Sequence, residues 1–294
     1  MIKNLKFKKF VLYCIVLNGL FHATTIQAQM RPRLPLPTSI PKRENVDSGN
    51  IRIWYALNAL NIKDPKTYDD FQCLEIGEKM SRYYSYFAYH SDSTYIDFIR
   101  KNPRAQGAPV RNLRGKVNYW SEYIFSEYVK NFSTNLFTEY TRMPHGIQGN
   151  YYYIEAIPAQ QWKIQDSTLS IAGFHCQKAT CNFNGRIFTA WFTTEVPIRN
   201  GPWKFGGLPG LIIKVYDHNK LYTFELVAIE NTKSKFLVSI INDDRFIKTD
   251  RTKLLKLQLD VNVNYYKASG AQPVNPSPNW TPPTDIVYHP LELK

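Results

Sequence analysis

Cysteines are the side chains of this sequence whose chemistry is easiest to anticipate, and three of them lie beyond residue 28: Cys73, Cys176 and Cys181. Asn184 and Gly185, flanked by apolar and β-branched residues, predict a two-residue hairpin turn preceded by a strand that carries Cys176 and Cys181. Five residues of strand put their sulfurs roughly 16 Å apart on opposite faces, whereas a disulfide needs Cα atoms within about 7 Å. In an oxidising compartment we therefore expect Cys73 to pair with one of the other two.

Catalytic and metal sites are harder to find. His175 adjoins Cys176, but neighbours in a strand point apart, so no metal site is expected. Nucleophile elbows, zinc-protease helices and phosphate-binding glycine loops are not found in the sequence. Glu195, Asp217 and His218 could converge near one end of the hairpin, yet carboxylates at strand ends usually serve solubility. We expect no catalytic residue and no cofactor. The predicted function is a binding or carrier module for an apolar or anionic envelope ligand or a partner protein, and a periplasmic hydrolase or processing enzyme with a non-standard site is the alternative.

Aromatic side chains around the hairpin could line a cleft for an apolar or sugar ligand, and the alternative is that they belong to the core. A tryptophan next to a lysine after a Gly-Pro corner suits an exposed loop better than a core, so Trp203 and Lys204 are expected at the surface. The expected ligand-binding residues are Trp191, Phe192, Trp203, Lys204 and Phe205.

Positive charge indicates a second kind of contact. The formal net charge is +13, and about +9 remains without the four lysines of residues 1–28. Residues 99–116 contain no acidic side chain, and their candidate contacts to phosphate or carboxylate are Arg100, Lys101, Arg104, Arg111 and Arg114. The alternatives are a solvated loop, or contact with an envelope glycolipid or an outer-membrane protein. Nucleic acid is not expected, because no recognition helix or stacked-aromatic motif accompanies the charge.

The elements that must position these residues are mostly strands. Apolar and aromatic runs predict strands at 51–59, 72–76, 82–89, 151–157, 162–171, 211–216, 221–230 and 236–241. Helices are expected at 93–101, 119–130 and 250–259. Strands this close in sequence imply an antiparallel arrangement. The predicted fold is mainly β (α+β): a single antiparallel sheet, curved like a half-barrel, with one to three helices packed on it.

A proline-rich loop separates the hairpin from the strand at 211–216. Pro197, Pro202 and Pro209 lack the donor that a central strand needs. Gly207, Pro209 and Gly210 are expected to form a structural turn of type II, with Gly210 at positive φ.

The run GPWKFGGLPGLI at 201–212 resembles the signature of the GLPGLI family of exported Bacteroidetes proteins. The hairpin matches as well, at positions such as Cys176, Gly185, Arg186 and Trp191, and weaker similarity extends to 70–86 and 288–293. The resemblance implies export and architecture but no chemistry. Because Cys176 is one of the matching positions, it favours Cys73 with Cys176 as the disulfide.

The N-terminal residues are typical of a secretory signal peptide, with a basic start, an apolar run from Phe10 to Phe21 and a small residue at Ala28. We expect a periplasmic or secreted protein without a transmembrane span in the mature chain. The predicted organisation is a signal peptide (1–28), a flexible proline-rich arm (29–50), a GLPGLI-like domain (51–268) and an extended proline-rich tail that closes on the domain (269–294).

Overall fold

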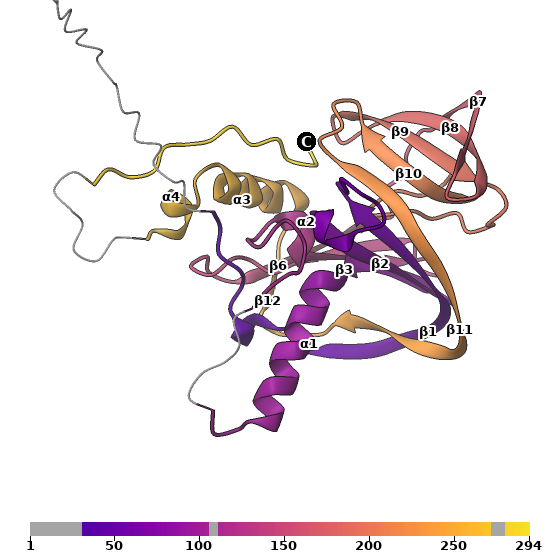
Figure 1. Ribbon diagram of the computed structural model, residues 1–294. Coiled ribbons are helices and arrows are strands. Elements are labelled where there is room, and N and C mark those ends of the chain that lie inside the picture. Colours follow the sequence, from indigo (N-terminus) through magenta and orange to yellow (C-terminus); the bar gives the residue numbers. More distant parts are fainter. Residues whose placement is uncertain (1–30, 106–110, 272–279) are drawn as a thin grey trace, which may run out of the picture.

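The computed structural model describes residues 31–105, 111–271 and 280–294 (Figure 1). The predicted signal peptide lies outside these residues. Twelve strands of the described chain form one sheet in the order β12-β6-β5-β4-β3-β2-β1-β11-β10-β9-β8-β7. The strands are Arg43–Leu57 (β1), Asp70–Gly77 (β2), Met80–Ser85 (β3), Ser126–Asn131 (β4), Leu136–Thr141 (β5), Asn150–Ala156 (β6), Lys163–Ile171 (β7), Phe174–Phe183 (β8), Arg186–Thr193 (β9), Leu211–Asp217 (β10), Thr223–Ile241 (β11) and Phe246–Lys248 (β12). The mainly β fold class is confirmed.

Two long strands give the sheet its curvature. β1 has 15 residues and β11 has 19, and both follow long arcs in Figure 1. Their antiparallel pairing shifts register at three places, one of them between Gly49 and Ile51, and such bulges bend a strand. A Cβ atom on Gly49 would lie 1.9 Å from the carbonyl oxygen of Ile76, so the neighbouring strand can approach only a glycine there. Pairing is antiparallel except between β12 and β6.

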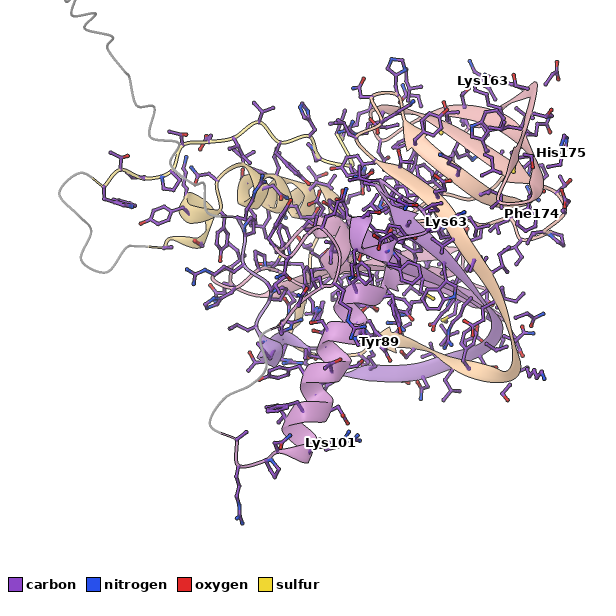
Figure 2. All side chains as sticks on the ribbon, in the orientation of Figure 1. Lys63, Tyr89, Lys101, Lys163, Phe174 and His175 are labelled. Atoms are coloured by element: carbon purple, nitrogen blue, oxygen red, sulfur yellow. The ribbon has the colours of Figure 1, made fainter. Side chains whose placement is uncertain are left out.

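Four α-helices of the described chain pack beside the sheet: Tyr86–Lys101 (α1), Glu122–Phe125 (α2), Arg251–Val263 (α3) and Tyr265–Ser269 (α4); short 3-10 turns lie at Pro37–Ser39 (η1) and Pro65–Thr67 (η2). α1 begins earlier than expected because the Ser85 side chain accepts a hydrogen bond from the Ala88 amide and caps it. Figure 2 shows α1 extending away from the sheet, with Lys101 at its outer end. The helices enclose a second core around Trp120, Phe125 and Val261.

The expected helix over 119–130 is wrong beyond Phe125. Residues 126–131 form the interior strand β4, whose edges pair with β3 and β5. The aromatic residues of this segment match neither the helical nor the strand periodicity. Backbone hydrogen bonds to a strand on each side therefore decide its conformation. Likewise, β1 begins at Arg43, inside the predicted flexible arm, because β11 is long enough to pair with it.

The Asn-Gly hairpin is confirmed in turn and in register. Asn184 and Gly185 have φ values of 49° and 84°, as a type I′ turn requires. Phe183 pairs with Arg186, and Cys181 pairs with Phe188. One face of this hairpin is buried in the main core, and the other stays partly open.

Candidate functional site

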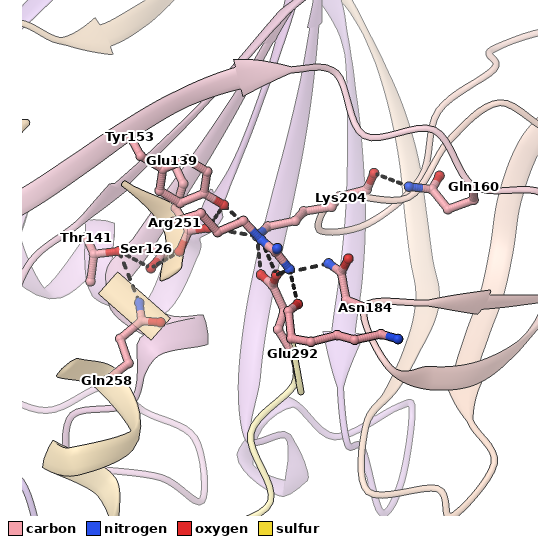
Figure 3. Close-up of polar contacts among 11 residues, drawn as sticks. Ser126, Glu139, Thr141, Tyr153, Gln160, Asn184, Lys204, Arg251, Gln258 and Glu292 are labelled. Carbon is pink, nitrogen blue, oxygen red and sulfur yellow. Dashed lines mark hydrogen bonds and ion pairs between the residues drawn. The ribbon is translucent and has the colours of Figure 1, made fainter. Parts of the chain in front are cut away.

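Lys204, expected at the surface, lies in the interior instead. Its side chain has no exposed area, and its Nζ lies 2.9 Å from Glu139 Oε2 and forms a second ion pair with Glu292 (Figure 3). Nζ also donates a hydrogen bond to the Tyr153 hydroxyl at 2.8 Å. Burial lowers the pKa of Lys204, but the two carboxylates outweigh that effect and raise it above its usual value. The charge is therefore tolerated because two opposite charges and a hydroxyl surround it.

Trp203 is also buried, with 2% of its surface exposed. Its ring packs against Phe205, with centroids 5.1 Å apart, and against Phe183 and Phe188. Trp203 adopts a φ of 53°, unusual for a large side chain, which turns the chain so that successive side chains enter the core. Phe192 and Phe205 are buried in the same cluster. The expected surface site on this loop is wrong, because the two halves of the curved sheet close over it.

Glu292 connects the buried lysine to two other parts of the molecule, the hairpin turn and α3. Its Oε2 accepts hydrogen bonds of 2.9 Å from Asn184 Nδ2 in the hairpin turn and from Arg251 Nε at the start of α3. Figure 3 shows these groups converging on the C-terminal segment. Arg186 donates to the Pro290 carbonyl in the same segment. The network therefore fastens residues 290–294 to the hairpin and to α3.

A small cavity adjoins this network, and three carboxylates line it. Its volume is about 20 Å³, and it is lined by Glu122, Glu139 and Glu292 together with Trp203 and Gln258. Burial raises the pKa of Glu122, whose carboxylate is bound by Tyr288 and Asn262. A cavity this size holds about one water molecule. The three carboxylates therefore have space for a water between them but not for a substrate.

Glu195 and Asp217, two of the candidate acid-base residues, lie at opposite ends of β9 and do not face each other. Asp217 is buried and pairs with Arg186 at 3.2 Å, opposite the beginning of β9. Glu195 follows the other end of β9, where it accepts a hydrogen bond from the His175 amide at 2.7 Å. Both carboxylates thus serve local structure. Among the described residues no cluster of His, Cys, Asp or Glu has metal-ligand geometry.

Trp191, one of the expected ligand-binding residues, lines an open groove. The groove has a volume of about 420 Å³, and its wall consists of Leu169, Ile171, Trp191, Lys214, Tyr216, Lys220, Thr223 and Glu225. Cross-strand pairing assembles it, since Trp191 on β9 lies opposite Lys214 on β10, which lies opposite Glu225 on β11. Lys214 Nζ and Glu225 Oε2 are 2.7 Å apart and partly exposed. The wall therefore combines apolar rings with paired charges.

The basic stretch is only partly neutralised by acids outside it. Arg100 and Lys101 pair with Asp97 on the exposed end of α1. Arg111 is 8% exposed and pairs with Asp92, so it is not a surface contact. Arg104 and Arg114 are exposed, and residues 106–110 lie outside the described residues.

The cysteines Cys73, Cys176 and Cys181 are free and buried. Cys73 lies on β2 and Cys176 on β8, with four strands between them in the sheet order. Cys73 adjoins Glu75 and Tyr84, whereas Cys176 belongs to the main apolar core. Burial raises the pKa of Cys181 to about 12, which disfavours its reactive thiolate. This arrangement separates the pair favoured by the sequence, and that disulfide remains a prediction.

Comparison with known proteins gives one family match. A family model described as the N-terminal domain of an N-glycanase peptide matches residues 114–256, which include the hairpin, the groove strands and the Lys204 loop. Two crystal forms of PNGF-II are structurally similar, with TM-scores of 0.41 and 0.42, identities of 12% and 13%, and 72% of this chain covered. The chain spans about a third of those proteins, since 33% of each is covered. No curated protein sequence matches.

Sequence reasoning found Trp191 but missed the other groove residues. Lys214, Tyr216 and Glu225 lie on β10 and β11, whose alternation of polar and apolar residues was visible. Their position beside Trp191 depends on the strand order, in which β10 lies between β9 and β11, and the sequence alone does not give that order. Among the described residues no helix is long and apolar enough to cross a membrane.

Proposed function

We propose that this protein is an exported binding module of the cell envelope, and that the groove beside Trp191 takes a sugar ring of a glycolipid or glycoprotein. The observation that carries the proposal is an aromatic side chain in an open groove next to the Lys214–Glu225 pair. A pyranose has an apolar face that packs on an aromatic ring and hydroxyls that bond to charged side chains. A purely apolar ligand would remove water from that partly exposed ion pair without replacing its hydrogen bonds.

One comparison supports this ligand class. The family model that matches 114–256 is named for an N-glycanase, so a glycan is a consistent ligand for a domain of this type. The GLPGLI resemblance supports export, which N-terminal sequencing would test: a chain that begins at Gln29 is expected, and an intact Met1 would contradict it. A hydrolase remains the alternative, but the cavity with its three glutamates holds only about one water.

The experiment is calorimetric titration of the purified protein with a free N-linked core oligosaccharide and, separately, with stearate. Trp191→Ala is expected to weaken oligosaccharide binding at least about tenfold, equivalent to about 1.4 kcal/mol. Its melting temperature should stay within a few degrees, because the ring is only partly buried. Ile187→Ala is the matched control, since Ile187 lies on the same face of β9, is 56% exposed and is not part of the groove wall.

Two results would contradict the proposal. One is an oligosaccharide affinity that Trp191→Ala leaves unchanged, and the other is binding of stearate but not of the oligosaccharide. The second result would keep the groove as a binding site and change its ligand to an apolar molecule.

A further inference from the structure

We propose that the protein has a second site, for a single anionic group such as phosphate, sulfate or carboxylate, between α1 and residues 111–114. A pocket of about 230 Å³ lies there, far larger than the roughly 30 Å³ that one water occupies. Its wall consists of His90, Ser91, Thr94, Tyr95, Arg111, Asn112 and Arg114. Every one of these side chains can donate a hydrogen bond, and none carries a negative charge.

The buried charges behind the pocket are not balanced. Asp92 Oδ1 pairs with Arg111, and Asp92 Oδ2 lies 2.6 Å from Arg142 Nη2. One carboxylate thus serves two guanidinium groups, whose side chains are 8% and 7% exposed. One positive charge remains in excess in a partly desolvated place, which is unfavourable unless another anion compensates it.

The two arginines also lack hydrogen-bond acceptors. Arg111 Nη1 donates to the Pro35 carbonyl, but Arg111 Nε and Arg142 Nη1 are buried without an acceptor among the described residues. Buried donors are nearly always paired, so the cluster lacks acceptors as well as negative charge. The burial of Arg111, together with the nearby Arg142, lowers the pKa of its guanidinium despite Asp92, which is consistent with an excess of positive charge.

Other charged groups nearby do not cancel this excess. Asp97, one turn further along α1, already pairs with both Arg100 and Lys101. Arg114 adds an exposed charge at the pocket wall. A tetrahedral or planar anion could accept from Arg114 and from the Ser91 hydroxyl, next to Arg111, which shares its only carboxylate partner with Arg142. A volume of about 230 Å³ suits a single group better than an extended polyanion.

The test is a thermal melt and a calorimetric titration with inorganic phosphate and with sulfate, at constant ionic strength maintained with chloride. Phosphate should raise the melting temperature with its concentration, as expected for a ligand of the folded state. Arg114→Gln should weaken phosphate binding at least about fivefold without changing the melting temperature in chloride alone. Arg100→Gln is the control, an exposed arginine on α1 that already has a carboxylate partner, and should change the affinity less than about twofold.

A second measurement concerns Arg111, whose removal could unfold the protein. The Nε resonance of Arg111 in the intact protein should shift on phosphate titration, because the anion supplies the missing charge. Co-sedimentation with phosphatidylglycerol vesicles, competed by phosphate, would identify a lipid headgroup as the source of the anion; binding of phosphate alone would identify a small anion. Stabilisation by phosphate no greater than by chloride would overturn the proposal, as would equal losses in Arg114→Gln and Arg100→Gln.

Discussion

Lys130 and Lys204 are both buried lysines, but different partners give them opposite pKa shifts. Lys204 contacts two carboxylates, which raise its pKa. Lys130 on β4 donates to Asn200 Oδ1 at 2.9 Å and to the Phe205 carbonyl, neither of which carries charge. Burial therefore lowers the pKa of Lys130 to about 7.

The Lys130 shift predicts a dependence of stability on pH. Between about pH 7 and the unfolded pKa of about 10.4, the unfolded chain holds a proton that the folded chain has released, so stability rises with pH. The penalty for burying Lys130 is complete below about pH 7 and is relieved above it. From about pH 7 to about pH 9, urea unfolding should show wild type gaining about 2 kcal/mol relative to Lys130→Met. The exposed Lys163→Met is the control and should run parallel to wild type; a parallel Lys130→Met would show that Lys130 stays charged.

At the scale of elements, the turn before β10 is tighter than the sequence indicated. The Gly210 amide donates to the Leu208 carbonyl at 2.8 Å, an i to i+2 bond around Pro209 instead of the i to i+3 bond of a type II turn. Gly210 has a φ of 154°, and a Cβ there would lie 1.9 Å from the Thr193 carbonyl oxygen. The end of β9 approaches so closely that Gly210 is required by its neighbour as well as by its φ.

Substitutions of Gly210 and Gly207 separate the steric effect of a neighbouring strand from the strain of a positive φ. Gly210→Ala should lower the free energy of unfolding by about 3 kcal/mol or more, because backbone atoms must move. Gly207→Ala should cost only about 1 kcal/mol, since Gly207 has a φ of 83° but no atom lies within 4 Å of the point that an added Cβ would occupy. Urea denaturation measures both, and equal losses would show that backbone conformation alone explains the two glycines.

At the scale of the whole molecule, the C-terminal segment holds distant parts together. Glu292 reaches the hairpin turn through Asn184, the core loop through Lys204, and α3 through Arg251. Tyr222 adds a hydrogen bond of 2.8 Å to the His289 carbonyl. The predicted tail that closes on the domain therefore has a charged anchor in its last residues.

Glu292→Gln tests this anchor. It removes one of the two negative charges beside Lys204, and the expected loss is about 2 kcal/mol, less than for a buried pair left entirely without a partner because Glu139 remains. Hydrogen exchange should accelerate together in the hairpin turn, the first turn of α3 and residues 288–293. Glu78→Gln is the control, since its ion pair with Lys235 is largely exposed and should contribute under about 1 kcal/mol. A loss no larger than that of Glu78→Gln would contradict the anchoring role.

Local signals in the sequence determined the strand-rich fold and the hairpin. Asn184 and Gly185 define a turn whose geometry needs no distant partner, and the register of β8 and β9 follows from it. Alternation of apolar residues then separated the buried face from the partly open one that carries Trp191.

Only the tertiary structure decided where Lys204 lies, that residues 126–131 are a strand, and which residues meet Trp191 in the groove. Each depends on partners far away in sequence: Glu139 and Glu292 for Lys204, and the neighbouring strands for β4 and for the groove. The free energy of burying a charge or pairing a strand is set by these partners, and a lysine beside a tryptophan gives no local sign of two carboxylates that arrive through folding.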